Sequence, residues 1–411
     1  MVQVFSLRGV RPDPRYAARI AAPPYDVVSE TETRERVQRN PCSFLQITRP
    51  ESLVDPASAC DPLERAVAAF RRMRASGWFL TESAPACYVY RLRMQGHVQT
   101  GWIVGASLDD YAAGVIRKHE LTRADKENER ARHIEALGAQ TGPVLMAYRA
   151  HEGLRQLTAR CVAADDPVYD FVDEHRVEHA LWVVTDPDAL QTLCEQFQGG
   201  SALYIADGHH RAASALRVRD ILRARHGPQG AGDECNRLLA AVFPHDELRV
   251  LGYHRLVKDL NGLSEPDFLA RLAQRFTVEK SRRFLPDQPG ELGMLLSGEW
   301  YRLSASPESI RDEDAVGRLD VSVLQKQALT PILGIGDVRT DPRIDFVGGL
   351  DGLDRLEQSC AADARVAFAL PPVAIAQLMA VADAQQVMPP KSTWFEPKLR
   401  SGLVVHDLAL A

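Results

Sequence analysis

The run Asp207-Gly-His-His-Arg211 places an aspartate, two histidines and an arginine within five residues. The apolar residues 202–206 before it predict a buried strand, Asp207-Gly208 a tight turn, and the alanines after Arg211 a helix. Glycine lets a ligand approach the backbone closely, and the first N–H groups of a helix can bind an anion. The run therefore favours a phosphate-binding turn over a plain helix cap formed by Asp207.

The predicted phosphate-binding residues of this turn are Gly208, His209, His210 and Arg211. Arg211 would add a charged, bidentate donor. Asp207 is predicted to hold a magnesium ion or to act as a base, because a lone carboxylate facing a bound phosphate is otherwise repelled. His209 is a further candidate for acid–base catalysis.

A second candidate group lies where the strand-like residues 115–117 end in a loop. Glu120 is a candidate base that would remove a proton from an attacking hydroxyl, with an ordinary loop carboxylate as the alternative. Lys118 and His119 would offer charge to a phosphoryl group. The polar residues 123–133 that follow are expected to form a solvated helix face.

The C-terminal run 389–398 holds two cations and two hydroxyls between prolines that favour an extended loop. Lys391, Ser392, Thr393 and Lys398 are therefore expected to bind a carboxylate or phosphate, and the run to fold back beside the turn. The alternative is a strap whose aromatic residues fill the core. Near the N-terminus, Tyr25 and Asp26 end a proline-stiffened turn that predicts either substrate binding or a rigid entry to the next helix.

Composition places these residues in an ordinary globular chain of 411 residues, long enough for two or three structural units. The formal net charge of −6 provides no net positive field for nonspecific binding of nucleic acid. No apolar stretch is long and uninterrupted enough for a membrane span, and no secretory leader is indicated. Seven scattered cysteines without a CxxC pair fit a reducing cytoplasm best. A small molecule is the expected partner, and a homo-oligomer is left open.

Helical and strand-like patterns alternate irregularly, which predicts an α+β fold with mixed sheets rather than a doubly wound parallel sheet. We expect a helix from Asp61-Pro62 to Gly77, a hairpin of 86–94 and 97–108, and a helix reaching Leu137 that Thr122 and Asp125 cap. A further helix is expected over 321–333. The predicted regions are an N-terminal α+β region (1–150), a region with the phosphate-binding turn (151–262) and a C-terminal α+β region (263–411).

The strand, the turn 206–211 and the alanine-rich helix resemble the phosphate-binding turn of the ParB and sulfiredoxin superfamily, above all its free serine kinase branch. The resemblance covers some fifteen residues and implies a ParB/sulfiredoxin-like nucleotide-binding core, with the nucleotide phosphates against residues 208–211. The chain departs from sulfiredoxins because His209 and His210 stand where these have a reactive cysteine. It also lacks the more basic turn of ParB proteins.

A second resemblance extends over nearly the whole chain. Its motifs are Phe5-Ser-Leu-Arg-Gly-Val-Arg-Pro12, Ala22-Pro-Pro-Tyr-Asp-Val-Val28, Lys118-His-Glu-Leu-Thr122, Ala206-Asp-Gly-His-His-Arg211 and Met388-Pro-Pro-Lys-Ser-Thr-Trp-Phe-Glu-Pro-Lys398. By these motifs the chain is identified as a member of the prokaryotic domain-of-unknown-function family 1015. This resemblance implies an association with serine-biosynthesis genes and no established activity.

The leading hypothesis is a nucleotide-dependent phosphotransferase that uses ATP or ADP, or another nucleotide, with Mg²⁺ and acts on a small hydroxyl substrate such as free serine. Catalysis would consist mostly of positioning and charge neutralisation. One alternative is a noncatalytic nucleotide-binding regulatory protein. The other is a phosphohydrolase that uses Asp207 and the histidines around a metal.

Overall fold

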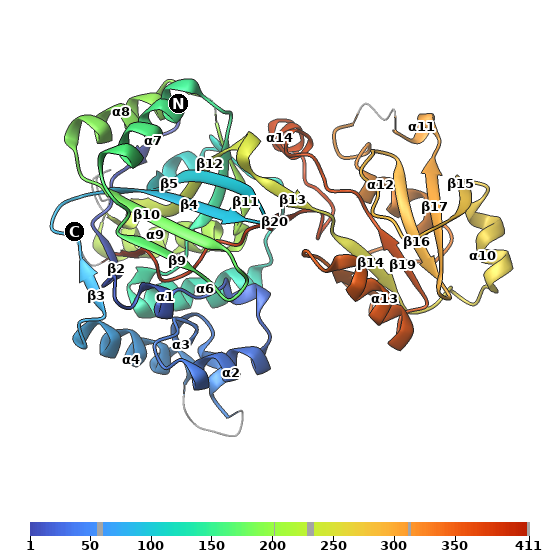
Figure 1. Cartoon of the computed structure of the whole chain (residues 1–411), viewed down its shortest axis with the longest axis horizontal. Helices are drawn as coiled ribbons and strands as arrows, with labels where there is room; N and C mark the ends of the chain where they lie inside the picture. The colour runs from blue at the N-terminus through green and yellow to red at the C-terminus, as the bar shows by residue number, and fades with distance from the viewer. Residues whose placement is uncertain (56–60, 201, 228–233, 311–313, 409–411) are drawn as a thin grey trace. The chain divides into compact units, whose positions relative to one another are not determined.

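The computed structural model describes residues 1–55, 61–200, 202–227, 234–310 and 314–408 (Figure 1). They form two compact units, unit 1 (Met1–Leu248 with Pro397–Ala411) and unit 2 (Arg249–Glu396). Unit 2 is thus inserted into the sequence of unit 1. The boundaries predicted near 150 and 262 do not coincide with this division, because β8 (Val144–Tyr148) and β12 (Arg237–Pro244) pair within one sheet.

The main sheet of unit 1 contains both parallel and antiparallel pairs. Its order is β6 (Ile116–Arg117), β11 (Leu203–Asp207), β8, β12, β5 (His97–Ser107), β4 (Cys87–Met94), β10 (Glu178–Val184) and β9 (Tyr169–Val172), with β1 (Val4–Phe5) also on β5. β11 runs parallel to β6 and β12 runs parallel to β8, whereas the other pairs are antiparallel. The prediction of an α+β chain with mixed sheets is therefore confirmed.

The predicted hairpin is formed by β4 and β5. Its two-residue turn places Gln95 at φ 52° and Gly96 at φ 82°. Two positive φ angles match the right-handed twist of the flanking strands. The glycine in this turn was the local signal that made the hairpin predictable.

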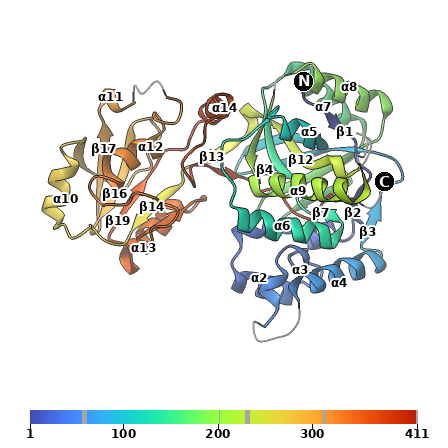
Figure 2. The same ribbon diagram turned by 180° about the vertical axis from the view of Figure 1, so that it is seen from behind.

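One face of the main sheet is covered by α6 (Ala124–Leu137), α7 (Glu152–Ala164), α8 (Pro187–Gln198) and α9 (His209–His226), which share its apolar core. Helices α6 and α9 pack side by side on this face (Figure 2). The predicted helix ending at Leu137 is thus present, but its predicted cap is wrong. Arg123 is the N-cap residue and no side chain caps it, whereas the Thr122 hydroxyl bonds to Glu127 one turn further along.

Short helices precede the main sheet, namely α1 (Ala17–Ile20), η1 (Tyr25–Val27), α2 (Glu30–Arg39), α3 (Leu45–Thr48), η2 (Pro50–Leu53) and α4 (Pro62–Ala75). Asp61 caps α4 by accepting the Leu63 N–H at 2.9 Å, as the sequence predicted. A capping box between Ser29 and Glu32 begins α2. The helix α5 (Leu108–Ala112) follows β5, and η3 (Glu234–Asn236) and η4 (His245–Glu247) flank β12.

The C-terminal segment belongs to a small sheet of unit 1 with the order β3 (Phe79–Thr81), β2 (Gly9–Pro12), β21 (Val405–Asp407) and β7 (Ala139–Gln140). β21 is an inner strand that pairs with β2 on one side and β7 on the other. The segment that starts at residue 397 is therefore built into unit 1 by backbone hydrogen bonds.

Unit 2 contains a six-stranded antiparallel sheet with the order β15 (Phe276–Ser281), β17 (Glu299–Ala305), β16 (Glu291–Leu296), β19 (Val366–Ala369), β14 (His254–Val257) and β18 (Ile344–Val347). A separate ribbon joins β13 (Arg249–Leu251) to β20 (Trp394–Glu396). The helices of unit 2 are α10 (Glu265–Leu272), α11 (Pro307–Ile310), α12 (Asp320–Leu324), α13 (Gly352–Ala362) and α14 (Ile375–Asp383). The helix predicted over 321–333 is shorter, since α12 passes into a π-helical turn, η5 (Gln325–Leu329). Within the described ranges, no helix combines the length and apolarity needed to cross a bilayer.

Candidate functional site

The predicted turn forms as expected between a buried strand and a helix. Leu203 to Ala206 are buried, and β11 lies between β6 and β8 in the main sheet. Gly208 then adopts φ 96°, in the left-handed region where a side chain is strained, and α9 begins at His209. Glycine at this position therefore allows the chain to turn directly from the strand end into the helix.

The first backbone N–H groups of α9 are not capped by a side chain. Its first intrahelical hydrogen bond runs from the Ala212 N–H to the Gly208 carbonyl oxygen at 3.1 Å, and Gly208 provides no side-chain cap. The N–H groups of His209, His210 and Arg211 consequently have no acceptor inside the helix. Together with the positive end of the helix dipole, three such groups form a site suited to an anion.

A lysine from the C-terminal segment pairs with the strand-end carboxylate. Lys398 Nζ donates to Asp207 Oδ2 at 3.2 Å. Burial acts to raise the pKa of Asp207, but the positive charges of Lys398 and Arg211 outweigh it, and the pKa is lowered. Asp207 is therefore a charged group with a fixed counter-ion, and its predicted role as a magnesium ligand stays a prediction.

Arg211 is held in place by a backbone carbonyl group directly before β8. Its guanidinium donates to the carbonyl oxygen of Pro143. Burial acts to lower the pKa of Arg211, yet the negative charges of Asp26 and Asp207 raise it above its usual value. The cation thus lies among carboxylates at the edge of the turn, with its charge retained.

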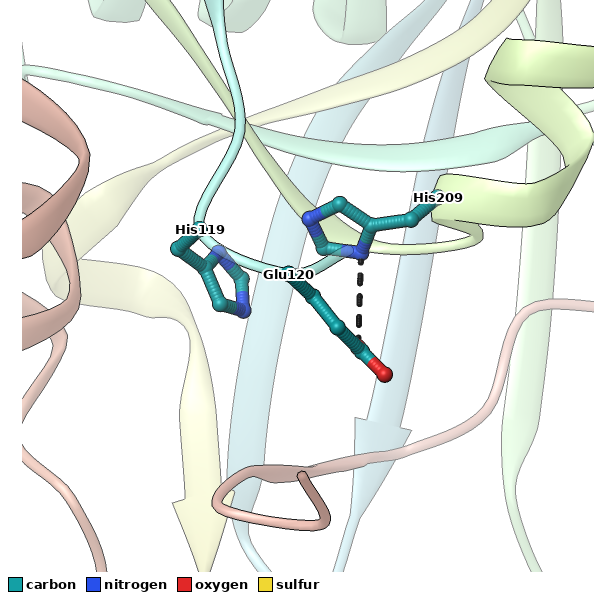
Figure 3. Close-up of side chains that lie close together, drawn as sticks. All are labelled: His119, Glu120 and His209. Atoms are coloured by element: carbon teal, nitrogen blue, oxygen red, sulfur yellow. Dashed lines mark ion pairs between the residues drawn. The ribbon is translucent and has the colours of Figure 1, made fainter. Parts of the chain in front are cut away.

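His119 and Glu120 reach the same edge because β6 and β11 are parallel, so that both strands end there. The rings of His119 and His209 meet edge to face, with centroids 4.5 Å apart. Glu120 Oε2 lies 3.7 Å from His209 Nδ1 (Figure 3). Two segments separated by almost ninety residues thereby form one cluster of two imidazoles and one carboxylate.

Both imidazoles of this cluster are buried and neutral at pH 7. Burial lowers the pKa of His119 to about 4. Burial and the neighbouring His119 hold the pKa of His209 well below its usual value. His119 Nδ1 and His209 Nε2 have no hydrogen-bond partner among the described residues, whereas the Glu120 side chain is 41% exposed. The cluster therefore offers nitrogen lone pairs beside a carboxylate that solvent can reach.

His210 and Lys118, the neighbours of the clustered residues in sequence, make different contacts. His210 Nε2 accepts the Arg123 N–H at 3.1 Å, so this ring connects α9 to the start of α6. Burial lowers the pKa of His210, which favours the neutral form required for that bond. Lys118 is exposed, and its Nζ lies 5.8 Å from the centroid of the Tyr111 ring.

Tyr25 and Asp26 lie in η1 beside the start of α9. The Arg130 guanidinium stacks 4.2 Å from the Tyr25 ring centroid, and burial raises the pKa of Tyr25. Asp26 is exposed, and its negative charge acts to raise the pKa of both Arg211 and His210. Arg130 is 7% exposed, so it turns inward from a helix predicted to be solvated. Arg130 also donates to the Thr48 carbonyl oxygen at 3.3 Å.

Three of the four predicted binding residues of the C-terminal run, Lys391, Ser392 and Thr393, belong to unit 2, and their part in binding stays a prediction. Lys391 is exposed, with Nζ 5.7 Å from the Tyr253 ring centroid. Ser392 is buried and donates to the Pro389 carbonyl oxygen at 2.6 Å, while Thr393 is half-buried. Of the two aromatic residues of β20, Phe395 is buried and Trp394 is half-buried.

A family model described as "Protein of unknown function (DUF1015)" matches residues 4–322, more than three quarters of the chain. The chain belongs to this family, and the resemblance read from its motifs is confirmed. The comparison with curated proteins gave no match.

Several solved structures are similar to the chain at low identity. A free serine kinase in complex with AMP is 14% identical with TM-score 0.35, covering 71% of this chain and 86% of that chain. A conserved hypothetical protein from Pyrococcus furiosus is 13% identical with TM-score 0.34, covering 72% of this chain and 93% of that chain. SbnI with a C-terminal truncation, from Staphylococcus aureus, is 11% identical with TM-score 0.36, covering 72% of this chain and 82% of that chain.

Proposed function

We propose that the chain binds the phosphates of ATP or ADP at the start of α9 and transfers a phosphoryl group to a small hydroxyl substrate, with free serine as the first candidate. The observation that carries this proposal is the uncapped helix start at Gly208. Three N–H groups there have no acceptor inside the helix, and the cations Arg211 and Lys398 lie at the same turn. Fixed donors of this kind stabilise phosphoryl groups during transfer.

The acceptor is expected on the side of the turn where Glu120 lies. In the proposed step the substrate hydroxyl oxygen attacks the terminal phosphorus of the nucleotide. The bond from this phosphorus to the bridging oxygen breaks, and ADP leaves if the donor is ATP, or AMP if the donor is ADP. The hydroxyl proton passes to Glu120, whose carboxylate is solvent-accessible beside a neutral His209. Tyr25 and Asp26 are proposed to lie next to the acceptor, because Asp26 is close enough to Arg211 for its charge to raise the pKa of this arginine.

The residues at the turn do not fit a magnesium ion held by the protein alone. Magnesium prefers an octahedron of oxygen ligands. Asp207 is already paired with Lys398, and the other clustered donors include two imidazoles. We therefore assign no step to a protein-bound magnesium ion and treat Mg²⁺ as a companion of the nucleotide.

A labelled-phosphate assay tests the proposal. Protein, Mg²⁺, nucleotide labelled on its terminal phosphate and free serine are expected to produce labelled phosphoserine. Glu120→Gln is expected to lower turnover far more than nucleotide affinity. His151→Ala, at an exposed position before α7, is the matched control and should leave both unchanged.

The product also separates the competing functions. Release of labelled inorganic phosphate without transfer would support the metal-assisted phosphohydrolase, which the cluster of His119, Glu120 and His209 favours. Tight nucleotide binding with no product across a panel of small hydroxyl compounds would support the regulatory protein. Absence of nucleotide binding would overturn the proposal.

A further inference from the structure

We propose that His119, Glu120 and His209 form a binding site for one divalent transition-metal ion, with Zn²⁺ as the expected occupant. One ligand atom from each residue lies within 4.8 Å of the other two. Bonds of about 2.0–2.2 Å from one ion would separate its ligand atoms by about 3–3.5 Å. The His209 Nδ1 to Glu120 Oε2 distance of 3.7 Å is already close to that separation. Small side-chain rotations would therefore complete the site.

The environment of His119 is that of a metal ligand. A backbone hydrogen bond with Ile205 acts on its ring, while Nδ1 has no partner among the described residues. Metal-bound histidines commonly donate their other N–H to a backbone carbonyl in this way.

Burial without a partner distinguishes this cluster from an ordinary core histidine. His119 is 2% exposed and His209 is 4% exposed, and each has one ring nitrogen without a partner. The buried His179 is different, since Tyr90 and Asp173 bond to its two nitrogens at 2.7 and 2.9 Å. Leaving a buried polar atom unpaired is unfavourable, so these two imidazoles, unlike His179, are not fully satisfied by the protein.

The donor set selects the class of ion. Imidazole nitrogen suits zinc and its neighbours, whereas magnesium and calcium require oxygen ligands. Two histidines and one glutamate form a known type of catalytic zinc site that keeps a further position open for water or substrate. The Asp207 carboxylate, which is paired with Lys398, also acts electrostatically on both imidazoles. This assignment does not depend on nucleotide binding.

Metal titration of the full-length chain tests the proposal. After treatment with EDTA and removal of the chelator, isothermal titration calorimetry with ZnCl₂ is expected to show one site per chain, and metal analysis after gel filtration should find one zinc. Excess MgCl₂ should not displace it. His119→Ala and His209→Ala should each weaken zinc binding by about 100-fold or more, because each removes a direct ligand.

Two further variants keep the experiment decisive. Glu120→Gln alters a half-exposed carboxylate conservatively, so it should weaken zinc binding without unfolding the chain even if an alanine variant proves unstable. His151→Ala, which removes an exposed histidine of the same unit, should bind zinc like the original chain. No zinc bound by the original chain, or undiminished binding in Glu120→Gln, would overturn the metal site. The nucleotide proposal would stand after that result, because its test uses different ligands.

Discussion

Lys398 Nζ and Asp207 Oδ2 are joined at 3.2 Å by residues 191 positions apart in the sequence. The lysine belongs to the segment that returns to unit 1 after unit 2, and the aspartate ends β11, directly before the turn at Gly208. The side chains are 18% and 29% exposed, so the pair is only partly screened by solvent. Lys398 therefore links the segment after unit 2 to the turn between β11 and α9.

Lys398→Met is expected to destabilise unit 1 by about 2 kcal/mol, because it leaves the carboxylate of Asp207 without its partner in a half-buried position. Asp207→Asn in the same chain should restore part of this loss, since the uncompensated charge is then removed. Urea unfolding at pH 7 measures both free energies of unfolding. Strictly additive losses in the double variant would contradict a direct interaction.

Gly208→Ala should weaken nucleotide binding beyond any general effect on stability. The φ of 96° strains an alanine, and a Cβ there would lie 3.2 Å from Arg211 Cζ. Gly96→Ala is the matched control, because Gly96 also has a positive φ, of 82°, and a Cβ there meets nothing within 4 Å. Both variants should lose about 1 kcal/mol or more of stability. Calorimetry with ADP should show weaker binding only for Gly208→Ala.

Arg211→Ala is expected to reduce nucleotide affinity by about 10- to 150-fold, because a hydrogen bond from a charged donor contributes about 1.5–3 kcal/mol. The variant also loses the bond to the Pro143 carbonyl oxygen, so its melting temperature must be measured in parallel. Arg217→Ala removes an exposed arginine from the same helix and should bind ADP normally. Equal affinity of the two variants would exclude Arg211 from the phosphate site.

Stability should fall as the pH drops from about 6.5 toward 4, in part because of His133. Burial lowers the pKa of His133 to about 4, so the folded chain keeps it neutral while the unfolded chain takes up a proton below about 6.5. At pH 5 this difference amounts to about 2 kcal/mol. His133→Gln retains a donor for the Ile47 carbonyl oxygen, which His133 Nε2 contacts at 2.6 Å.

Urea unfolding at pH 7 and pH 5 checks this expectation. The loss of stability between the two pH values should be smaller in His133→Gln than in the original chain, by about the contribution of one histidine. His175→Gln, at a histidine whose side chain is 61% exposed, should keep the full loss. The same pH dependence in all three chains would contradict the buried neutral state of His133.

The elements that sequence patterns predicted are those defined by local residues. The hairpin turn at Gln95-Gly96 and the strand, turn and helix around Gly208 each carry their signal within a few positions. The grouping of His119 and Glu120 with His209 depends on parallel pairing of β6 with β11, which no local pattern specifies. The cap of α6 was mispredicted because Thr122 has an alternative acceptor in Glu127.

The contact of Lys398 likewise could not be predicted from local sequence. Its type and the neighbouring prolines identified it as a cation available for binding, but its partner Asp207 is set by the path of the chain after unit 2. Lys391 and Ser392 occur in the same run and belong to the other unit. A division of one short motif between two units is invisible in the spacing of its residues.

The position of β21 in the small sheet also determines the order in which the protein can assemble during synthesis. β21 pairs with both β2 and β7, so neither of these strands has its inner neighbour until β21 itself has left the ribosome. At about 5–20 residues per second, translation of the roughly 150 residues of unit 2 takes about 7–30 s. Throughout that interval the nascent unit 1 has an Asp207 without its lysine, and every new copy therefore passes through a period in which the carboxylate at the end of β11 lacks this counter-ion.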